Sequence, residues 1–147
     1  VFFVSLDGFD NHDGLLTKHP ELMGQLDEAL SAFYAATVEM GVQNQVTTFT
    51  MSDFGRSLQG NSDGSDHGWG NHHFILGGAV KGQQFYGTAP AVSLTADDQI
   101  GQGRLLPSTA VDQYVATLAT WFGVANSDLA TVVPRIGNYA AANLGFL

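Results

Sequence analysis

The chain has 147 residues, 44% of them hydrophobic and 13% charged, which is enough apolar material for a folded domain with a core. Fourteen acidic residues against five basic ones give a formal net charge of −9. This balance disfavours binding to the phosphates of nucleic acids and to anionic membrane surfaces. Cysteine is absent, so disulfides and thiolate chemistry are excluded. The sequence contains neither a recognisable signal peptide nor the roughly 18 consecutive apolar residues of a membrane span.

The first residues of the chain predict a buried strand. Val1–Leu6 is a run of apolar, β-branched and aromatic residues that ends at the turn signal Asp7-Gly8. A continuous apolar run of this kind is typical of a parallel sheet that is covered on both faces. Because the sequence opens in mid-strand and without an initiator methionine, we expect an earlier, amino-terminal segment to be missing.

A helix and a second strand are predicted next. Pro20 suits the first turn of a helix, apolar side chains follow at helical spacing as far as Val38, and Gly41 is a natural stop. The β-branched run Val46–Met51 predicts a strand. Strand, helix and strand in this order favour a right-handed crossover between two parallel strands.

The middle of the chain contains few regular signals. Five glycines lie between Asp53 and Asn71, which predicts a long loop, and loops of this length are usually functional or disordered. Phe74–Val80 predicts a third strand, weakened by two glycines, and residues 82–107 look irregular.

Two helices are predicted near the end of the sequence. The first begins after a capping hydroxyl and ends before Gly123, and the second is stopped by Pro134. Their expected bounds are Ser108 or Thr109 to Phe122, and Asn126 or Ser127 to Val133.

Acidic and histidine side chains follow both predicted strands. Asp7, Asp10 and His12 come after the first strand, and Asp53 and Arg56 come after the second. Because ligands bind beyond the carboxyl ends of parallel strands, we expect Asp10, His12 and Asp53 to converge. Carboxylate and imidazole groups together suit zinc, iron or manganese.

Some of the residues in these two segments have a second interpretation. An aspartate after a strand is often a turn former that bonds its own backbone, and this interpretation is favoured for Asp7 and applies to Asp13 as well. Arg56 is either a bidentate clamp for an anionic substrate or the partner of a buried aspartate.

Three of the five histidines lie close together in the glycine-rich segment, between His67 and His73. His67 follows Asp66, so it is a candidate ligand or an imidazole that this carboxylate orients. His72 and His73 begin a strand-like run and should point to opposite faces, which leaves one of them for packing.

Several segments, in this order along the chain, resemble the bacterial DUF1501 family of proteins of unknown function. Gly8-Phe9-Asp10-Asn11-His12 is similar to a Gly-Trp-Asp-Thr-His segment of that family. The other segments that carry the resemblance are Ser52-Asp53-Phe54-Gly55-Arg56, Asp66-His67-Gly68-Trp69-Gly70-Asn71, Gly77-Gly78-Ala79-Val80-Lys81-Gly82, Tyr86-Gly87, Arg104-Leu105-Leu106-Pro107, Ser108-Thr109-Ala110-Val111-Asp112-Gln113-Tyr114, Trp121-Phe122-Gly123 and Val133-Pro134-Arg135-Ile136-Gly137-Asn138-Tyr139.

The resemblance implies an α/β fold like that of alkaline phosphatase, with a mainly parallel sheet between helices. Residues 1–147 would then be the carboxyl-terminal part of a single domain of this kind, whose amino-terminal part is missing. It also implies divalent metal ions, zinc among them, because related phosphatases and sulfatases use two. By similarity, Asp10, His12, Asp53 and His67 look like metal ligands, with Asp7 and Asp66 as supporting or additional ligands.

The sequence departs from the superfamily in two respects. The superfamily motif Ser-Asp-His-Gly reads Ser52-Asp53-Phe54-Gly55, so one histidine ligand is replaced by Phe54. The superfamily's Ser or Thr nucleophile and its earliest metal-binding aspartate come from a first strand that this sequence does not contain.

The resemblance leads us to expect a metal-dependent hydrolase of phosphate or sulfate esters. Its expected partners are the missing amino-terminal portion and an anionic small-molecule ester, and the family implies export through the twin-arginine route to the periplasm or beyond. The alternative is a non-catalytic exported or surface-assembly protein that retains the fold. A third interpretation is that the metal ions are purely structural.

Overall fold

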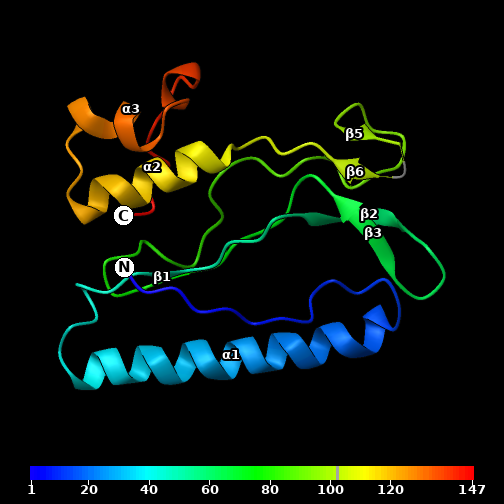
Figure 1. Ribbon diagram of the computed structural model, residues 1–147, viewed down its shortest axis with the longest axis horizontal. Coiled ribbons are helices and arrows are strands. Elements are labelled where there is room, and N and C mark those ends of the chain that lie inside the picture. Colours follow the sequence, from blue (N-terminus) through cyan, green and yellow to red (C-terminus); the bar gives the residue numbers. More distant parts are fainter. Residues whose placement is uncertain (102) are drawn as a thin grey trace.

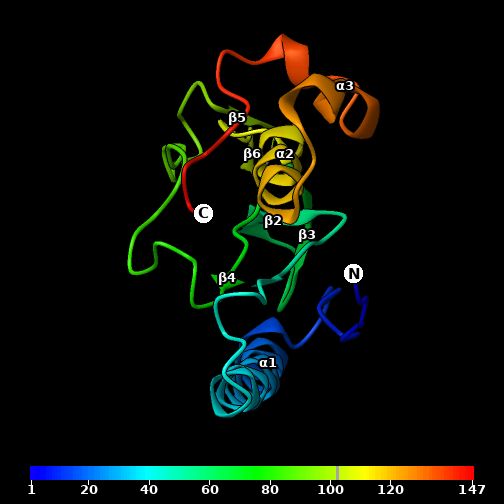
Figure 2. The same ribbon diagram turned by 90° about the vertical axis from the view of Figure 1, so that its left-hand side faces the viewer.

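Helices lie on two sides of the molecule, with extended segments between them (Figure 1 and Figure 2). The long helix α1 (Leu15–Glu39) is on one side, and α2 (Val111–Phe122) and the single turn α3 (Leu129–Val132) are on the other. The computed structural model describes residues 1–101 and 103–147. Within these ranges, no helix combines the length and the apolar character that a membrane crossing requires.

The strands are short and pair two by two. They are β1 (Thr48–Phe49), β2 (Gly55–Gly60), β3 (Ser65–Gly68), β4 (Ile75–Leu76), β5 (Gln99–Ile100) and β6 (Arg104–Leu105). β1 pairs with β4, β2 with β3, and β5 with β6, and all three pairs are antiparallel. The expected alkaline-phosphatase-like fold with a mainly parallel sheet is therefore wrong for this chain, whose described residues form a small mixed fold.

The expected crossover between two parallel strands is not formed within the described residues, because its first strand is missing. Val1–Leu6 forms no regular element and pairs with no strand in the described part of the chain, and Val1, Phe2, Phe3 and Val4 are each more than 90% exposed. A buried strand needs partners for its backbone groups and cover for both faces, and this run has neither. β1 pairs with β4 instead, so the expected strand Val46–Met51 is reduced to two residues.

The segment 53–71 is not a structureless loop, because it contains the β2–β3 hairpin. Gly55 lies opposite Gly68, and Arg56 lies opposite His67. A Cβ atom on Gly55 would lie 1.8 Å from the carbonyl oxygen of Gly70, and one on Gly68 would lie 2.8 Å from that of Arg56. The glycines that suggested a loop therefore allow backbone segments to approach closely. Two further short strands, β5 and β6, interrupt the region expected to be irregular.

Helix α1 begins five residues before Pro20, which lies inside it rather than in its first turn. The backbone N–H of Leu15 has no partner within the helix and donates a 2.9 Å hydrogen bond to the carbonyl oxygen of Asp63 at the hairpin turn. This contact fixes the start of α1 against the hairpin. The expected stop is confirmed, because α1 ends at Glu39 and Gly41 adopts a φ of 71°.

The core lies around α2. One buried cluster contains Ala116, Leu129, Val133 and Ile136, and a second contains Tyr114, Leu118 and Phe146. The predicted end of α2 at Gly123 is confirmed, since this glycine adopts a φ of 108° as a left-handed cap. The second predicted helix is also present, as the 3-10 turn η1 (Asn126–Asp128) followed by α3, and a last turn, η2 (Ile136–Asn138), comes after Pro134. Most of α1 is exposed, so the carboxyl-terminal third carries the best-packed part of the fold.

Candidate metal centre

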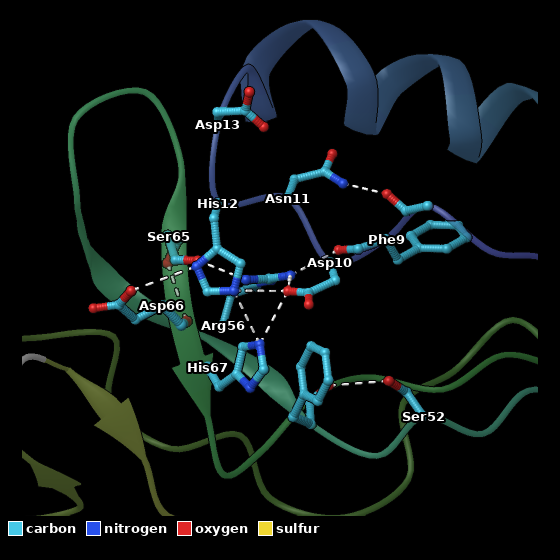
Figure 3. A network of polar contacts seen from close by, with 12 residues as sticks. Phe9, Asp10, Asn11, His12, Asp13, Ser52, Arg56, Ser65, Asp66 and His67 are labelled. Carbon is cyan, nitrogen blue, oxygen red and sulfur yellow. Dashed lines mark hydrogen bonds and ion pairs between the residues drawn. The ribbon is translucent and has the colours of Figure 1, made fainter.

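Asp10, His12 and His67 meet at one point beside the hairpin (Figure 3). The Oδ1 atom of Asp10 lies 2.9 Å from Nε2 of His12 and 2.9 Å from Nε2 of His67. The two Nε2 atoms are 3.1 Å apart. Three of the four residues expected to bind metal are thus brought together from positions 57 residues apart in the chain.

The spacing of these three atoms fits a small divalent ion. Zinc binds histidine nitrogen and carboxylate oxygen at about 2.0–2.2 Å, so a tetrahedral ion separates its ligand atoms by roughly 3.3 Å. The observed separations of 2.9 to 3.1 Å are close to this value. One carboxylate and two imidazoles are also a donor set that zinc, iron and manganese accept. The residues therefore fit a bound metal ion.

The segment before α1 is held against the hairpin by backbone contacts. The side-chain amide of Asn11, a buried residue, donates to the carbonyl oxygen of Gly8, and the backbone N–H of Ser65 lies 3.4 Å from the carbonyl oxygen of Asn11. A Cβ atom on Gly64 would lie only 2.2 Å from the carbonyl group of His12. Only glycine at position 64 permits this approach, which places Asp10 and His12 beside β3.

Strand β3 supplies His67. Its register with β2 places Arg56 directly opposite His67, so both side chains lie on one face of the hairpin. The backbone carbonyl of His67 accepts a 3.2 Å hydrogen bond from Nε of Arg104 in β6. The backbone of His67 therefore lies between β2 on one side and Arg104 of β6 on the other.

Arg56 joins the two parts of the centre. Its Nη2 donates to Oδ1 of Asp10 and, at 3.0 Å, to the carbonyl oxygen of Phe9, and its Nη1 donates to the carbonyl oxygen of Ser65 at 2.6 Å. The arginine side chain is 20% exposed, against 53% for Asp10. Arg56 therefore pairs with an aspartate, which was one of the two interpretations of this residue. The aspartate is exposed, however, and not buried as that interpretation assumed.

The ionised form of Asp10 is favoured by its neighbours. The hydrogen bond from Arg56, followed by that from His67, lowers the pKa of the Asp10 carboxyl below its ordinary value. Asp10 is consequently a carboxylate at neutral pH, the form in which it can bind a cation.

The supporting residues expected from the sequence divide into two groups. Asp66 lies near the centre, but it faces His12, with Oδ1 3.6 Å from Nδ1 of that histidine, rather than the adjacent His67. The amide of Asn61 donates to Asp66 at 2.6 Å and holds it there. Asp53 and Asp7 are exposed and lie outside the cluster of ligand atoms.

The other histidines lie away from the centre. His73 is partly buried, stacks on Tyr114 of α2 and lies 3.3 Å from the hydroxyl of Thr50, so it is the packing member of the adjacent pair, whereas His72 is exposed. His19 makes an edge contact with Phe9.

Sequence reasoning did not identify the residues that assemble the centre. The contribution of Asn11 and Gly64 depends on burial and on backbone contact between distant segments, which no local pattern records. The density of glycine around position 64 is the one local signal, and it predicts a loop rather than a close contact.

Comparison with known proteins gives one family. A model for the family described as "Protein of unknown function (DUF1501)" matches residues 1–121. No curated protein and no solved structure matches the chain. Because the family model covers well over half of the chain and includes Asp10, His12 and His67, the chain belongs to the DUF1501 family.

Proposed function

We propose that this protein is a metal-dependent hydrolase of phosphate or sulfate esters whose ion is held by Asp10, His12 and His67. The observation that carries the proposal is the convergence of three ligand atoms within 4.8 Å of one another. A divalent ion in this position supplies Lewis-acid chemistry, which polarises an ester oxygen and stabilises the negative charge that develops on it.

Each residue of the centre has a distinct role in the proposal. Asp10 provides an anionic oxygen, and Arg56 keeps that oxygen directed at the two histidines. Asp66 lies beside Nδ1 of His12, which favours a proton on that nitrogen and leaves Nε2 free to bind the ion.

The exposure of the centre supports a role in catalysis rather than a purely structural role for the metal ion. The side chains of Asp10, His12 and His67 are 53%, 48% and 47% exposed, so a small anionic ester can reach them from solvent. The choice of phosphate or sulfate esters rests on the resemblance of the motifs to those of alkaline phosphatases and sulfatases, and it is part of the proposal.

One observation favours a non-catalytic alternative. In the described ranges, no serine or threonine hydroxyl hydrogen-bonds to Asp10, His12 or His67. The nearby hydroxyl of Ser65 bonds to Ser57, and that of Ser52 bonds to the carbonyl oxygen of Phe54. The described residues thus place no hydroxyl against the three ligands, which is consistent with an exported or surface-assembly protein that binds metal without catalysing a reaction.

We further propose that the protein is exported to the periplasm or beyond and that the chain is the carboxyl-terminal portion of a longer protein. The resemblance to exported DUF1501 proteins supports the first proposal. The run Val1–Val4, which is almost fully exposed, is consistent with the second. Cell fractionation and sequencing of the gene upstream of Val1 test these two proposals separately.

Metal analysis combined with a panel of phosphate and sulfate monoesters tests the proposed activity. The full-length protein is expected to contain a divalent metal and to hydrolyse at least one ester class, and His67→Ala should lose both properties. The matched control His72→Ala changes an exposed histidine outside the centre and should retain them. Metal binding without turnover would support the non-catalytic alternative, and absence of both would refute the proposal.

A further inference from the structure

We infer that Phe54 is a positioning residue that orients the imidazole of His67 for metal binding. This inference rests on the proposed metal centre, and it concerns a residue that binds no ion itself. The ring centroids of Phe54 and His67 are 3.7 Å apart, and the ring planes differ by 8°. The two rings are therefore stacked face to face, next to Asp10.

Phe54 is fixed in place independently of His67. Its backbone carbonyl accepts hydrogen bonds of 3.0 Å from the hydroxyl of Ser52 and of 3.0 Å from the side-chain amide of Asn71. The guanidinium carbon of Arg56 lies 5.2 Å from the centroid of the Phe54 ring. These bonds hold the backbone of Phe54, and its ring lies between Arg56 and His67 with one face stacked on the imidazole.

The stack replaces a contact that histidine ligands ordinarily make. A metal-binding imidazole is usually oriented by a hydrogen bond from its second ring nitrogen to a carboxylate or carbonyl group. For His12, the carboxylate of Asp66 stands near this position, with Oδ1 3.6 Å from Nδ1. For His67, no residue in the described part of the chain hydrogen-bonds to Nδ1. The plane of the His67 ring, a torsion with only broad intrinsic preferences, is therefore set by the stack on Phe54 together with the contact of Nε2 with Asp10.

The stack also becomes stronger when an ion binds. The face of a phenyl ring carries partial negative charge and attracts groups with positive character. An imidazole coordinated to a divalent cation is poorer in electrons than a free one, so its attraction to the Phe54 face increases. Phe54 consequently favours the metal-bound state over the metal-free state.

Zinc titration of the full chain by calorimetry tests the inference. Phe54→Leu keeps an apolar side chain but removes the flat ring, and it should weaken zinc binding by about 10-fold or more, the range seen when groups that orient a ligand are removed. Phe54→Tyr keeps the ring and should stay within about 3-fold of wild type. Phe85→Leu changes a phenylalanine that is 94% exposed and serves as the matched control.

A second measurement begins with the wild-type protein and needs no metal ion. In the metal-free protein, the ring current of Phe54 should shift the His67 ring protons upfield in NMR spectra, and the shift should disappear in Phe54→Leu. If Phe54→Leu does not fold, as judged by thermal unfolding, Phe54→Met replaces it in both experiments.

The possible results separate this inference from the proposed centre. Wild-type zinc affinity in Phe54→Leu, with binding lost in His67→Ala, would overturn the role of Phe54 and leave the centre intact. Absence of the upfield shift in the wild-type protein would also overturn it. Wild-type affinity in both variants would refute the centre itself.

Discussion

The Nε2 atoms of His12 and His67 lie 3.1 Å apart, although 55 residues separate the two histidines in the chain. Both nitrogens also face the same oxygen of Asp10 at 2.9 Å. One carboxylate oxygen can accept hydrogen bonds from two imidazoles, and a single ion can also be bound by all three atoms at once. The geometry is therefore compatible with the shared coordination that we propose.

Replacement of Asp10 by asparagine should weaken metal binding strongly. Asp10→Asn keeps the shape of the side chain but removes the negative charge that both the ion and Arg56 require. We expect the zinc affinity to fall at least 10-fold in a calorimetric titration. Asp7→Asn removes an equivalent exposed charge outside the centre and should leave the affinity unchanged. Equal losses in the two variants would show that only net charge matters.

Replacement of Arg56 by lysine should destabilise the protein despite the retained charge. A lysine cannot reproduce the planar fork that reaches Asp10, Phe9 and Ser65 together. Loss of the bonds to the two carbonyl groups should lower the free energy of unfolding by about 1–2 kcal/mol, measured by urea denaturation. Arg135→Lys, at an exposed position, is the control. An Arg56→Lys variant as stable as wild type would argue against this bridging role.

A change at Gly64 should disturb the centre without altering any ligand. In Gly64→Ala the added Cβ atom would lie 2.2 Å from the carbonyl group of His12, so the two segments must separate. We expect a loss of about 1–3 kcal/mol in the free energy of unfolding, together with weaker zinc binding. Gly24→Ala adds a Cβ in open space on α1 and should instead stabilise the protein by about 0.5–1 kcal/mol. Unchanged zinc binding in Gly64→Ala would contradict the proposed contact.

The stability of the fold should decrease below about pH 6.5 because of His73. Burial, and then the neighbouring His72, lower the pKa of His73 from its ordinary value of 6.5 in the folded state. As the pH falls through 6.5, the unfolded chain therefore gains a proton that the folded chain does not bind, which favours unfolding. His73→Phe retains a ring against Tyr114 but cannot be protonated. Melting temperatures between pH 7.5 and pH 5 should fall less steeply for this variant, and parallel curves would exclude His73 as the cause.

The helices were predictable from sequence because their signals are local. The apolar spacing up to Phe122 and the glycine at position 123 both lie within one segment, and the structure confirms them. The strands were not predictable to the same degree, because a strand depends on partners far away in the chain. Val1–Leu6 has the composition of a buried strand, yet nothing within the run indicates whether another strand will pair with it.

In the candidate site, too, the local signals were predictable from sequence and the contacts between distant segments were not. The motifs indicate Asp10, His12 and His67 as ligands, but the edge of a parallel sheet, which was expected to bring Asp10 and His12 together with Asp53, is absent from the described residues. An antiparallel hairpin brings the three ligands together instead, through a close approach that Gly64 permits. Asp53 was expected at the centre because it follows a predicted strand, and without the parallel sheet it lies outside the cluster.

X-ray absorption spectroscopy of the zinc-loaded protein tests the central claim most directly, because it reports the atoms bound to the ion. Coordination by Asp10, His12 and His67 predicts two imidazole ligands and at least one oxygen at about 2.0–2.2 Å. In His67→Ala, which should bind zinc too weakly to be loaded, the spectrum with two imidazole ligands should be absent. A zinc spectrum without imidazole ligands, or one unchanged by His67→Ala, would contradict the assignment.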